Sequence, residues 1–502
     1  MRMNLVRRAG LSGAVRGLSS RLDSVSGLPR FEEVARLHPV DLVAPGLVGL
    51  ELDGPGEGPL PQPAPYAAVV AEDREGSGIG RATLRLRSGD DRIEAVLDGR
   101  STELRVGCGG VEQRHRSRRH GRLPRTAAPD GFALTLTGTQ VTLFARTGSV
   151  WTARARTSLT AHDIDPHDPE WLAGLHAEAA GEVGRVRAGA FGQLGLRDLR
   201  LVSNADGTAY RPAGLAESHV LLTATSAGAG FFATAHASVW ELDTDALTLR
   251  HRADLFFRRG EDVYGDQAVH LVRDPDGAEG PDGLGSWLVA TSTWGDFVDP
   301  AVDHVHVELG RSTADLLDGR HVIDTEPLHL PTTGLHSVGV WDPHIVAAPR
   351  QDGADAAREW LVGYVSARRY FDFHPVVATG PALDALTLRA AATERRATEG
   401  TTLVPLPMGA GSGHPGEAAW RVLASDGRDN RRAYRSAYPV FDLDLHQVGT
   451  LDAPYPTNLP WPTIVPTPKG MLLIGFDGTP TGGRLPGYGT HGAVVIAREI
   501  RD

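Results

Sequence analysis

Three carboxylates at the heads of apolar, strand-like runs are the strongest candidates for chemistry in this chain. Asp342 lies in the run 339–346 (GVWDPHIV), Asp198 in 196–202 (LRDLRLV) and Glu399 at the start of 399–404 (EGTTLV). A carboxylate close to a core costs free energy unless it is paired or used. For Asp342 alone, an Asp-Pro turn before an ordinary strand is the plainer interpretation. The recurrence of the pattern along the chain favours a site.

These acids belong to a repeat that begins at Gly195. Each unit opens with a short apolar strand and continues with two or three further strand-like runs. The openings are marked by Asp198, Asp266, Asp342, Glu399 and Trp461, which are 68, 76, 57 and 62 residues apart. Such spacing fits four-stranded propeller blades with insertions. We therefore predict a five-bladed β-propeller over residues 191–502. The fifth unit leaves no room for a fourth strand, so we expect a strand from the junction with the preceding domain to close it.

The chain before the repeat also has an all-β pattern. From about 42 to 190, short alternating runs such as Phe132–Leu136, Val141–Arg146 and Trp171–Ala179 are separated by Gly, Asp and Ser clusters. Some ten strands before any strong helix signal predict a β-sandwich over residues 41–190. The runs 131–136 and 141–146 resemble the hairpins of laminin-G or concanavalin-like jelly rolls. Residues 1–40 are expected to form a basic N-terminal segment, so the predicted fold class is all-β.

Composition narrows the functional classes. A length of 502 residues predicts two or three domains, and a net charge of −11 argues against a nucleic-acid partner. One cysteine, Cys108, excludes an internal disulfide framework and a Cys-based zinc site. We find no run long enough to cross a membrane and no secretory signal, so the expected location is the cytoplasm, without membrane association. The sequence does not address the oligomeric state.

The predicted fold brings the three acids together. The first strand of every propeller blade lines the central axis, so Asp198, Asp342 and Glu399 should converge on one mouth. Hydrolysis of a glycosidic bond needs such a set: one carboxylic acid protonates the leaving oxygen and one carboxylate activates water. A third acid nearby can raise the pKa of the general acid by repulsion. No phosphate-binding loop, nucleophile elbow or His-Glu-x-x-His motif is present.

Three dipeptides in these units resemble motifs of the five-bladed propeller glycosidases of glycoside hydrolase family 43 and the related families 32, 62 and 68. Arg197-Asp198 resembles the first-blade motif, which implies that Asp198 is the general base. Asp342-Pro343 resembles the third-blade motif, which implies an orienting acid that modulates the pKa of its neighbour. Glu399-Gly400 resembles the fourth-blade motif, which implies that Glu399 is the general acid. The resemblance covers residues 191–502.

The chain departs from the family pattern at two places. Leu199 stands where the family has proline, and Thr379-Gly380 replaces a serine after the third strand of blade three. These departures leave room for a distinct family with a shifted triad, in which Asp266 or Asp372 takes a role.

Aromatic and histidine side chains near the strand heads are the further candidates. Trp341 and Trp461 would stack on a sugar face, or equally pack between blades. His344 shares a strand face with Asp342. The resemblance implies that His491 lies below the site near a structural calcium ion, although a buried, hydrogen-bonded histidine fits equally well. The predicted substrate-binding residues are Arg197, Asp266, Trp341, His344, Trp461 and His491.

The sequence thus predicts a glycosidase that requires no cofactor and takes an oligosaccharide or glycan as substrate. The expected reaction is hydrolysis, with inversion, of an arabinofuranosyl, fructofuranosyl or xylosyl linkage. A retaining fructosidase or a glycoside phosphorylase on the same scaffold is the alternative enzyme. A non-catalytic glycan-binding protein is the alternative of another class, because propellers and jelly rolls both serve as binding modules.

Overall fold

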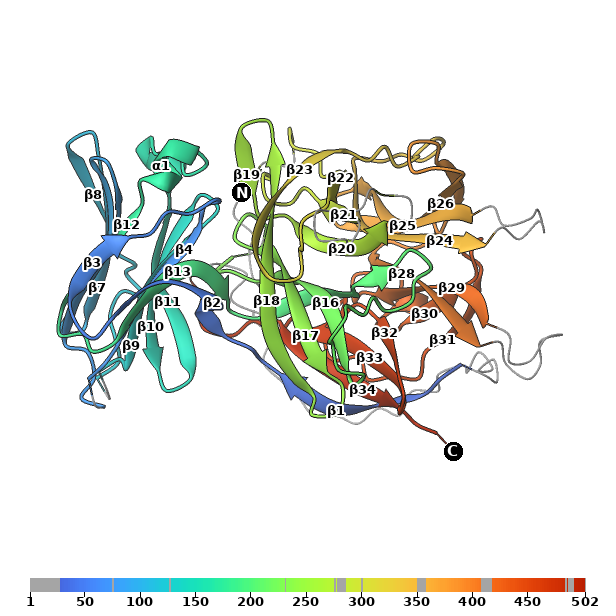
Figure 1. Cartoon of the computed structure of the whole chain (residues 1–502), viewed down its shortest axis with the longest axis horizontal. Coiled ribbons are helices and arrows are strands. Elements are labelled where there is room, and N and C mark those ends of the chain that lie inside the picture. Colours follow the sequence, from blue (N-terminus) through green and yellow to red (C-terminus); the bar gives the residue numbers. More distant parts are fainter. Residues whose placement is uncertain are drawn as a thin grey trace.

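The computed structural model describes residues 28–74, 76–125, 128–230, 232–274, 277, 286–298, 301–349, 358–407, 418–483, 485 and 492–501. Within them the chain forms a β-sandwich followed by a five-bladed β-propeller (Figure 1). The predicted fold class is therefore confirmed. No helix in this part of the chain is long and apolar enough to cross a membrane.

The sandwich consists of two six-stranded sheets, in the orders β11-β10-β9-β4-β13-β2 and β3-β12-β5-β6-β7-β8. Its strands are β2 (Asp41–Leu52), β3 (Gly56–Pro59), β4 (Tyr66–Glu72), β5 (Arg81–Ser88), β6 (Asp91–Asp98), β7 (Ser101–Cys108), β8 (Val111–His115), β9 (Gly131–Thr137), β10 (Gln140–Thr147), β11 (Val150–Ser158), β12 (His176–Gly181) and β13 (Val186–Gln193). Alternate residues such as Leu84, Leu86 and Leu134 fill the space between the sheets. The predicted strand Trp171–Ala179 is wrong in its first half, because Asp168 caps the short helix α1 (Pro169–Ala173) there.

The propeller blades are antiparallel and follow one another along the chain. Blade one contains β14 (Leu196–Leu201), β16 (His219–Ser226), β17 (His236–Asp243) and β18 (Thr248–Arg259). Blade two contains β20 (Gln267–Asp274), β21 (Ser286–Ser292), β22 (Val307–Ser312) and β23 (Gly319–Pro327). Blade three contains β24 (Gly339–Pro349), β25 (Arg358–Arg369), β26 (Asp372–Gly380) and β27 (Thr387–Ala391). Blade four contains β28 (Thr398–Pro407), β29 (Ala418–Asp426), β30 (Pro439–Phe441) and β31 (Gln447–Thr450).

Blade five is completed by a strand from the other end of the chain. It contains β32 (Thr463–Thr467), β33 (Gly470–Asp477) and β34 (Ala493–Glu499), and β1 (Phe31–Leu37) pairs antiparallel with β34. Figure 1 shows β1 beside the C-terminal strands, although the whole sandwich separates them in sequence. The closing strand thus precedes the sandwich and falls inside the stretch 1–40 that we expected to be a basic segment. Residues 1–27 of that stretch lie outside the described residues.

Apolar residues between neighbouring blades hold the ring together. The innermost strands alternate, so that Leu271 packs toward blade one while Val272 packs toward blade three. A separate apolar cluster, which includes Tyr66, Phe191 and Phe256, joins the sandwich to blade one. The Tyr66 hydroxyl also donates a hydrogen bond to the carbonyl of Ala235 (3.0 Å). The heads of the innermost strands are thereby fixed around one axis.

Candidate active site

The head of each innermost strand carries a residue with positive φ, a conformation that residues other than glycine rarely adopt. In blades one to four this residue coincides with an irregularity in the register between the first and second strands. The five residues are Asp198 (φ 53°), Ala268 (57°), Asp342 (60°), Gly400 (74°) and Trp461 (50°). We call them the bulge residues. Strained backbone of this kind clusters at active sites, so the ring of bulge residues marks one end of the axis as the candidate site.

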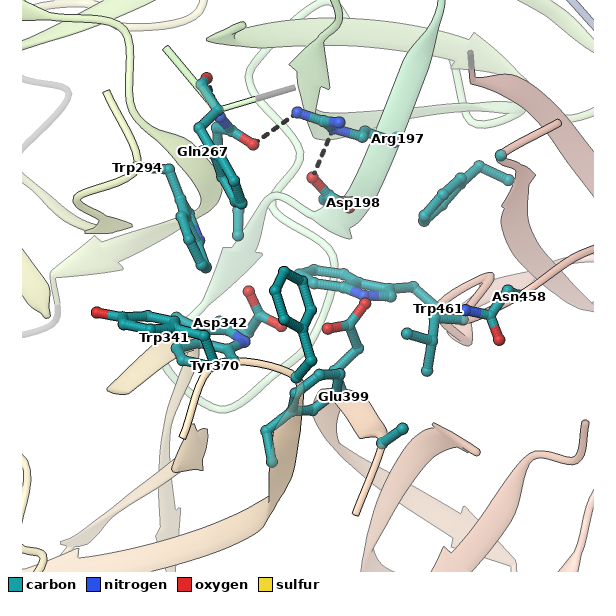
Figure 2. Close-up of a pocket in the computed structure, with 18 of the residues that line it drawn as sticks. Arg197, Asp198, Gln267, Trp294, Trp341, Asp342, Tyr370, Glu399, Asn458 and Trp461 are labelled. Carbon is teal, nitrogen blue, oxygen red and sulfur yellow. Dashed lines mark hydrogen bonds and ion pairs between the residues drawn. The ribbon is translucent and has the colours of Figure 1, made fainter. Parts of the chain in front are cut away.

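A cavity of about 600 Å³ lies at this end of the axis (Figure 2). All three predicted catalytic acids line it, and they come from three different blades. Three of the six predicted substrate-binding residues line it too: Arg197, Trp341 and Trp461. In Figure 2 the carboxyl groups of Asp342 and Glu399 point toward the centre of the view, between Asp198 and Trp461. The carboxylate oxygen Oδ2 of Asp342 is buried and has no hydrogen-bond partner in the described part of the chain.

The Glu399-Gly400 dipeptide has a clear structural reason. A Cβ atom on Gly400 would lie 2.8 Å from the indole ring of Trp461, and the φ of 74° disfavours any side chain there. Glycine therefore lets Trp461 pack directly against the strand head. Glu399 precedes the bulge, whereas Asp198 and Asp342 occupy it, so the acid of blade four reaches the cavity from a different backbone position.

Burial raises the pKa of all three carboxyl groups, but their surroundings differ. The pKa of Glu399 rises to about 8, first through burial and then through the charge of Asp198, while Trp461 and Arg197 oppose the shift. The pKa of Asp342 rises well above its usual range through burial, the charge of Glu399 and that of Asp198. The pKa of Asp198 also rises through burial, but Arg197 counteracts it, with Nε 3.3 Å from Oδ2. We expected Asp342 to repel Glu399, and the two carboxyl groups do repel each other, while Asp198 adds to the repulsion on Glu399.

The buried Arg200, which the sequence analysis missed, lies directly below the acids. Its guanidinium donates hydrogen bonds to the carbonyl of Asp342 (3.0 Å) and to the hydroxyl of Thr402 (3.1 Å), and it lies 4.6 Å from the centre of the Trp461 ring. Burial lowers the pKa of Arg200 to about 10, and the charges of Asp342 and Asp198 counteract the shift. Arg200 thus remains a cation at neutral pH and stabilises negative charge on the two aspartates.

The structure places Asp266 away from the cavity, which corrects its prediction as a substrate-binding residue. Asp266 is fully buried, forms an ion pair with Arg259 and accepts a hydrogen bond from the backbone N–H of Gly295 (3.0 Å). Burial raises its pKa to about 6. The bulge residue of blade two is Ala268, two positions later, so this blade contributes no acid to the ring. Asp372, the other alternative acid, pairs with Arg368 and does not line the cavity either.

His344 also lies below the cavity rather than in its lining, so its prediction as a substrate-binding residue is corrected too. Its ring stacks on that of His270 at 4.2 Å, and its Nδ1 accepts a hydrogen bond from the backbone N–H of Leu403 (3.4 Å). Burial lowers the pKa of both histidines well below the usual value, so both are neutral. His491 lies outside the described residues, and the expectation of calcium there stays untested. Among the described residues, no group of three or more His, Cys, Asp or Glu side chains is arranged to hold a metal ion.

The walls of the cavity are residues that the sequence analysis did not single out. They come from loops between second and third strands and from the connection into blade five. The lining residues from blades one to three are mainly aromatic: Phe232, Trp294, Phe297, Tyr370, Phe371 and Phe373. Those from blades four and five are mixed, with the polar Arg428, Asp429, Thr457 and Asn458 beside the apolar Ala397, Leu459 and Phe476. Because first and second strands are antiparallel, these loops had to lie at the same end as the strand heads.

Comparisons with known proteins give only distant similarities. No family model and no curated protein matches the chain. Among solved structures, the chain is similar to RS223-beta-xylosidase, with 12% identity, a TM-score of 0.36, and coverage of 61% of this chain and 92% of that one. It is similar to the GH43_1 enzyme from Xanthomonas citri in complex with xylotriose, with 13% identity, a TM-score of 0.36, and coverage of 60% and 88%. It is also similar to the Hadza microbial sialidase Hz136, with 12% identity, a TM-score of 0.31, and coverage of 91% and 88%.

Proposed function

We propose that this protein is a glycoside hydrolase that cleaves an arabinofuranosyl, fructofuranosyl or xylosyl linkage with inversion. The observation that carries the proposal is the convergence of Asp198, Asp342 and Glu399, from three separate blades, on one cavity. Sugar binding alone does not require three neighbouring buried carboxyl groups, and each of them costs free energy to bury. Acid–base hydrolysis, in contrast, needs one protonated and one ionised carboxyl group at the same bond.

The different surroundings of the three acids support a different proposed role for each. With a pKa of about 8, Glu399 holds its proton at pH 7 and serves as the general acid that protonates the leaving oxygen. Asp198, beside Arg197 and above Arg200, is the carboxyl group whose anion is best stabilised, and it serves as the general base. In this mechanism Asp198 takes a proton from water, the water oxygen attacks the anomeric carbon, and the glycosidic C–O bond breaks as Glu399 gives up its proton.

Asp342 then acts as an orienting residue between the other two. Its unpaired, buried Oδ2 is free to accept a hydrogen bond from a sugar hydroxyl, which would also remove the penalty of an unsatisfied acceptor. Trp341 and Trp461 offer flat rings beside the acids, where a sugar face can stack. Arg197 also donates a hydrogen bond to Gln267 (2.6 Å), which fixes the guanidinium at the cavity wall.

The proposal is tested with Glu399→Gln, which keeps the size of the side chain but cannot deliver a proton. We expect turnover of glycosides with poor leaving groups to fall roughly 100- to 10,000-fold, while aryl glycosides with good leaving groups lose much less. Glu326→Gln, the same change at an exposed position on β23, is the matched control and should leave turnover unchanged. Both variants are assayed on nitrophenyl glycosides and on plant and cell-wall glycans.

Two results would contradict the proposal. Unchanged turnover of poor leaving groups by Glu399→Gln would remove Glu399 from the role of general acid. A wild-type protein that binds glycans but hydrolyses none would make the chain a glycan-binding protein. The anomer formed first, followed by proton NMR, distinguishes inversion from the retaining alternative.

A further inference from the structure

The cavity has two chemically different halves. The half formed by loops of blades one to three, here called the aromatic wall, consists of Phe232, Trp294, Phe297, Val298, Tyr370, Phe371 and Phe373. The opposite half, here called the polar half, carries the polar side chains of Arg428, Asp429, Thr457 and Asn458 together with the apolar Leu459 and Phe476. The three acids lie between them. Sugar hydroxyls can find partners in the polar half, so the aromatic wall needs a different occupant.

The aromatic wall extends out to the surface of the protein. Phe371 and Val298 both line the cavity, yet their exposed fractions are 78% and 80%. Single exposed apolar side chains are common on proteins. These two differ because they line the same cavity as a partly buried aromatic cluster, in which Phe232 stacks on Trp294 at 4.6 Å. A continuous apolar surface that opens at a cavity mouth is typical of a ligand-binding site.

Phe371 is held at the mouth in a strained conformation. It lies in the tight turn between β25 and β26 with a φ of 71°, where glycine or asparagine is the usual residue and a bulky side chain is an outlier. The preceding Tyr370 anchors the turn, since its hydroxyl donates to the carbonyl of Asp303 (2.9 Å) and accepts from the N–H of Val305 (3.2 Å). A side chain that is exposed and held in a strained conformation buries little apolar surface of its own, and such positions are typical of functional sites.

The aromatic wall is poor in groups that could replace the hydration of a second sugar ring. The Tyr370 hydroxyl, the only hydroxyl among the described residues of the wall, is already bonded to the backbone on both its donor and its acceptor side. A sugar placed there would bury hydroxyls without partners, which costs about 1–3 kcal/mol each. An apolar group would instead gain free energy from every methylene that it buries.

We propose that the aromatic wall binds an apolar aglycone, and that Phe371 contacts this aglycone at the mouth of the cavity. The substrate is then a glycoside of a hydrophobic alcohol or phenol, with its sugar in the polar half and its leaving oxygen at Glu399. This inference rests on the proposed function and names the substrate class of the same site.

The test uses alkyl glycosides, because chain length changes apolar surface but hardly changes the acidity of the leaving alcohol. Methyl, butyl, hexyl and octyl β-D-xylopyranosides and α-L-arabinofuranosides are compared below their micellar concentrations. We expect kcat/KM to rise about two- to fourfold per added methylene until the chain reaches the mouth. A flat dependence on chain length would overturn the proposal.

Phe371→Asn isolates the role of the exposed ring. Asparagine tolerates the left-handed conformation, so this variant should fold with an unchanged or raised melting temperature. The gain in kcat/KM per added methylene should shrink in this variant. Phe371→Trp, which keeps an apolar ring, should retain the preference. An unchanged chain-length dependence in Phe371→Asn would remove Phe371 from the aglycone site.

Binding measurements separate this inference from the proposed function. Quenching of tryptophan fluorescence reports on ligands in the cavity, because Trp294, Trp341 and Trp461 line it. If no glycoside is hydrolysed but octyl glycosides bind more tightly than methyl glycosides in a Phe371-dependent way, the aglycone site stands and the hydrolase proposal fails. If glycosides are hydrolysed without any chain-length preference, the hydrolase proposal stands and the aglycone site fails.

Discussion

The raised pKa of Glu399 predicts that this one side chain makes the stability of the protein depend on pH. Replacing Glu399 with glutamine should remove that contribution. In the unfolded chain a glutamate ionises near its ordinary pKa of about 4.5, whereas in the folded protein Glu399 holds its proton up to about pH 8. Between these two values Glu399 carries a proton in the folded state that it has lost in the unfolded state. The free energy of unfolding therefore falls as the pH rises through this window, and the fall ends above pH 8.

The expected size follows from the same two values. Each pH unit in the window lowers the contribution of Glu399 to the free energy of unfolding by about 1.4 kcal/mol, which amounts to roughly 3 kcal/mol between pH 4.5 and pH 7. Glu399→Gln carries no proton that the folded state must hold. Relative to the wild type, the variant should therefore gain stability from pH 5 to pH 8, and at pH 7 its melting temperature should lie several degrees higher.

Thermal or urea unfolding followed by tryptophan fluorescence between pH 5 and pH 9 measures this difference. The signal reports on the propeller, because Trp461 lies beside Glu399 and Trp341 lines the same cavity. The wild type and Glu326→Gln should show parallel curves, and Glu399→Gln should diverge from both. The pH dependence of kcat/KM for the wild type should also show an alkaline limb near pH 8. If the stability curve of Glu399→Gln runs parallel to that of the wild type, the carboxyl group is not held protonated.

Two further predictions concern the elements that support the site. Arg200→Met should raise the pKa of Asp198 and thus move the acidic limb of the pH–rate profile to higher pH. The loss of the buried donors to Asp342 and Thr402 should also lower the melting temperature. An acidic limb at the wild-type pH would exclude an electrostatic role of Arg200. Removal of residues 1–37 deletes β1 and exposes the edge of β34, so we expect a lower melting temperature and aggregation. Removal of residues 1–27 alone is the control. Equal melting temperatures of the two truncated proteins would show that β1 is dispensable.

The order of domains and blades could be predicted from the sequence because it depends on local patterns of residues. Alternating apolar residues and turn-forming clusters mark each strand, and these signals extend over six to ten residues. Asp198, Asp342 and Glu399 stood out because carboxylates in apolar strands are costly and rare. The helix α1 was missed because Trp171 and Leu172 fit a strand equally well, and the capping signal of Asp168 and Pro169 was outweighed.

Long-range pairing was beyond the sequence. Nothing in Phe31–Leu37 indicates a partner more than 450 residues away, because its single pronounced feature is a mixture of charged and apolar residues. The aromatic wall is also assembled from loops of three blades, and only the assembled propeller brings Phe232, Trp294 and Tyr370 together. For such residues the available signal is topological: loops after second strands meet the heads of first strands.

In blade two the sequence analysis chose Asp266 as the residue at the strand head, whereas the bulge residue is Ala268. The bulge is defined by backbone conformation, and it accepts Asp198, Ala268, Asp342, Gly400 and Trp461 alike. No residue type marks the position, so a search for acids selected Asp266, whose carboxylate pairs with Arg259 away from the cavity. A position that is defined by backbone conformation alone cannot be predicted from residue type when different residues occupy it.

Because the bulge position accepts different residue types, a scaffold of five similar blades can hold an asymmetric site. The five bulges supply equivalent backbone positions, and the residue before each bulge is equally free to vary: Arg197, Gln267, Trp341, Glu399 and Pro460. Two aspartates at bulges and one glutamate just before a bulge place three carboxyl groups at unequal positions around one cavity. Their electrostatic environments consequently differ: Arg197 lies beside Asp198, whereas burial and the charge of Asp198 dominate at Glu399. A matched ring of five acids would repel without distinguishing acid from base, so the separation of roles depends on the departures from fivefold symmetry.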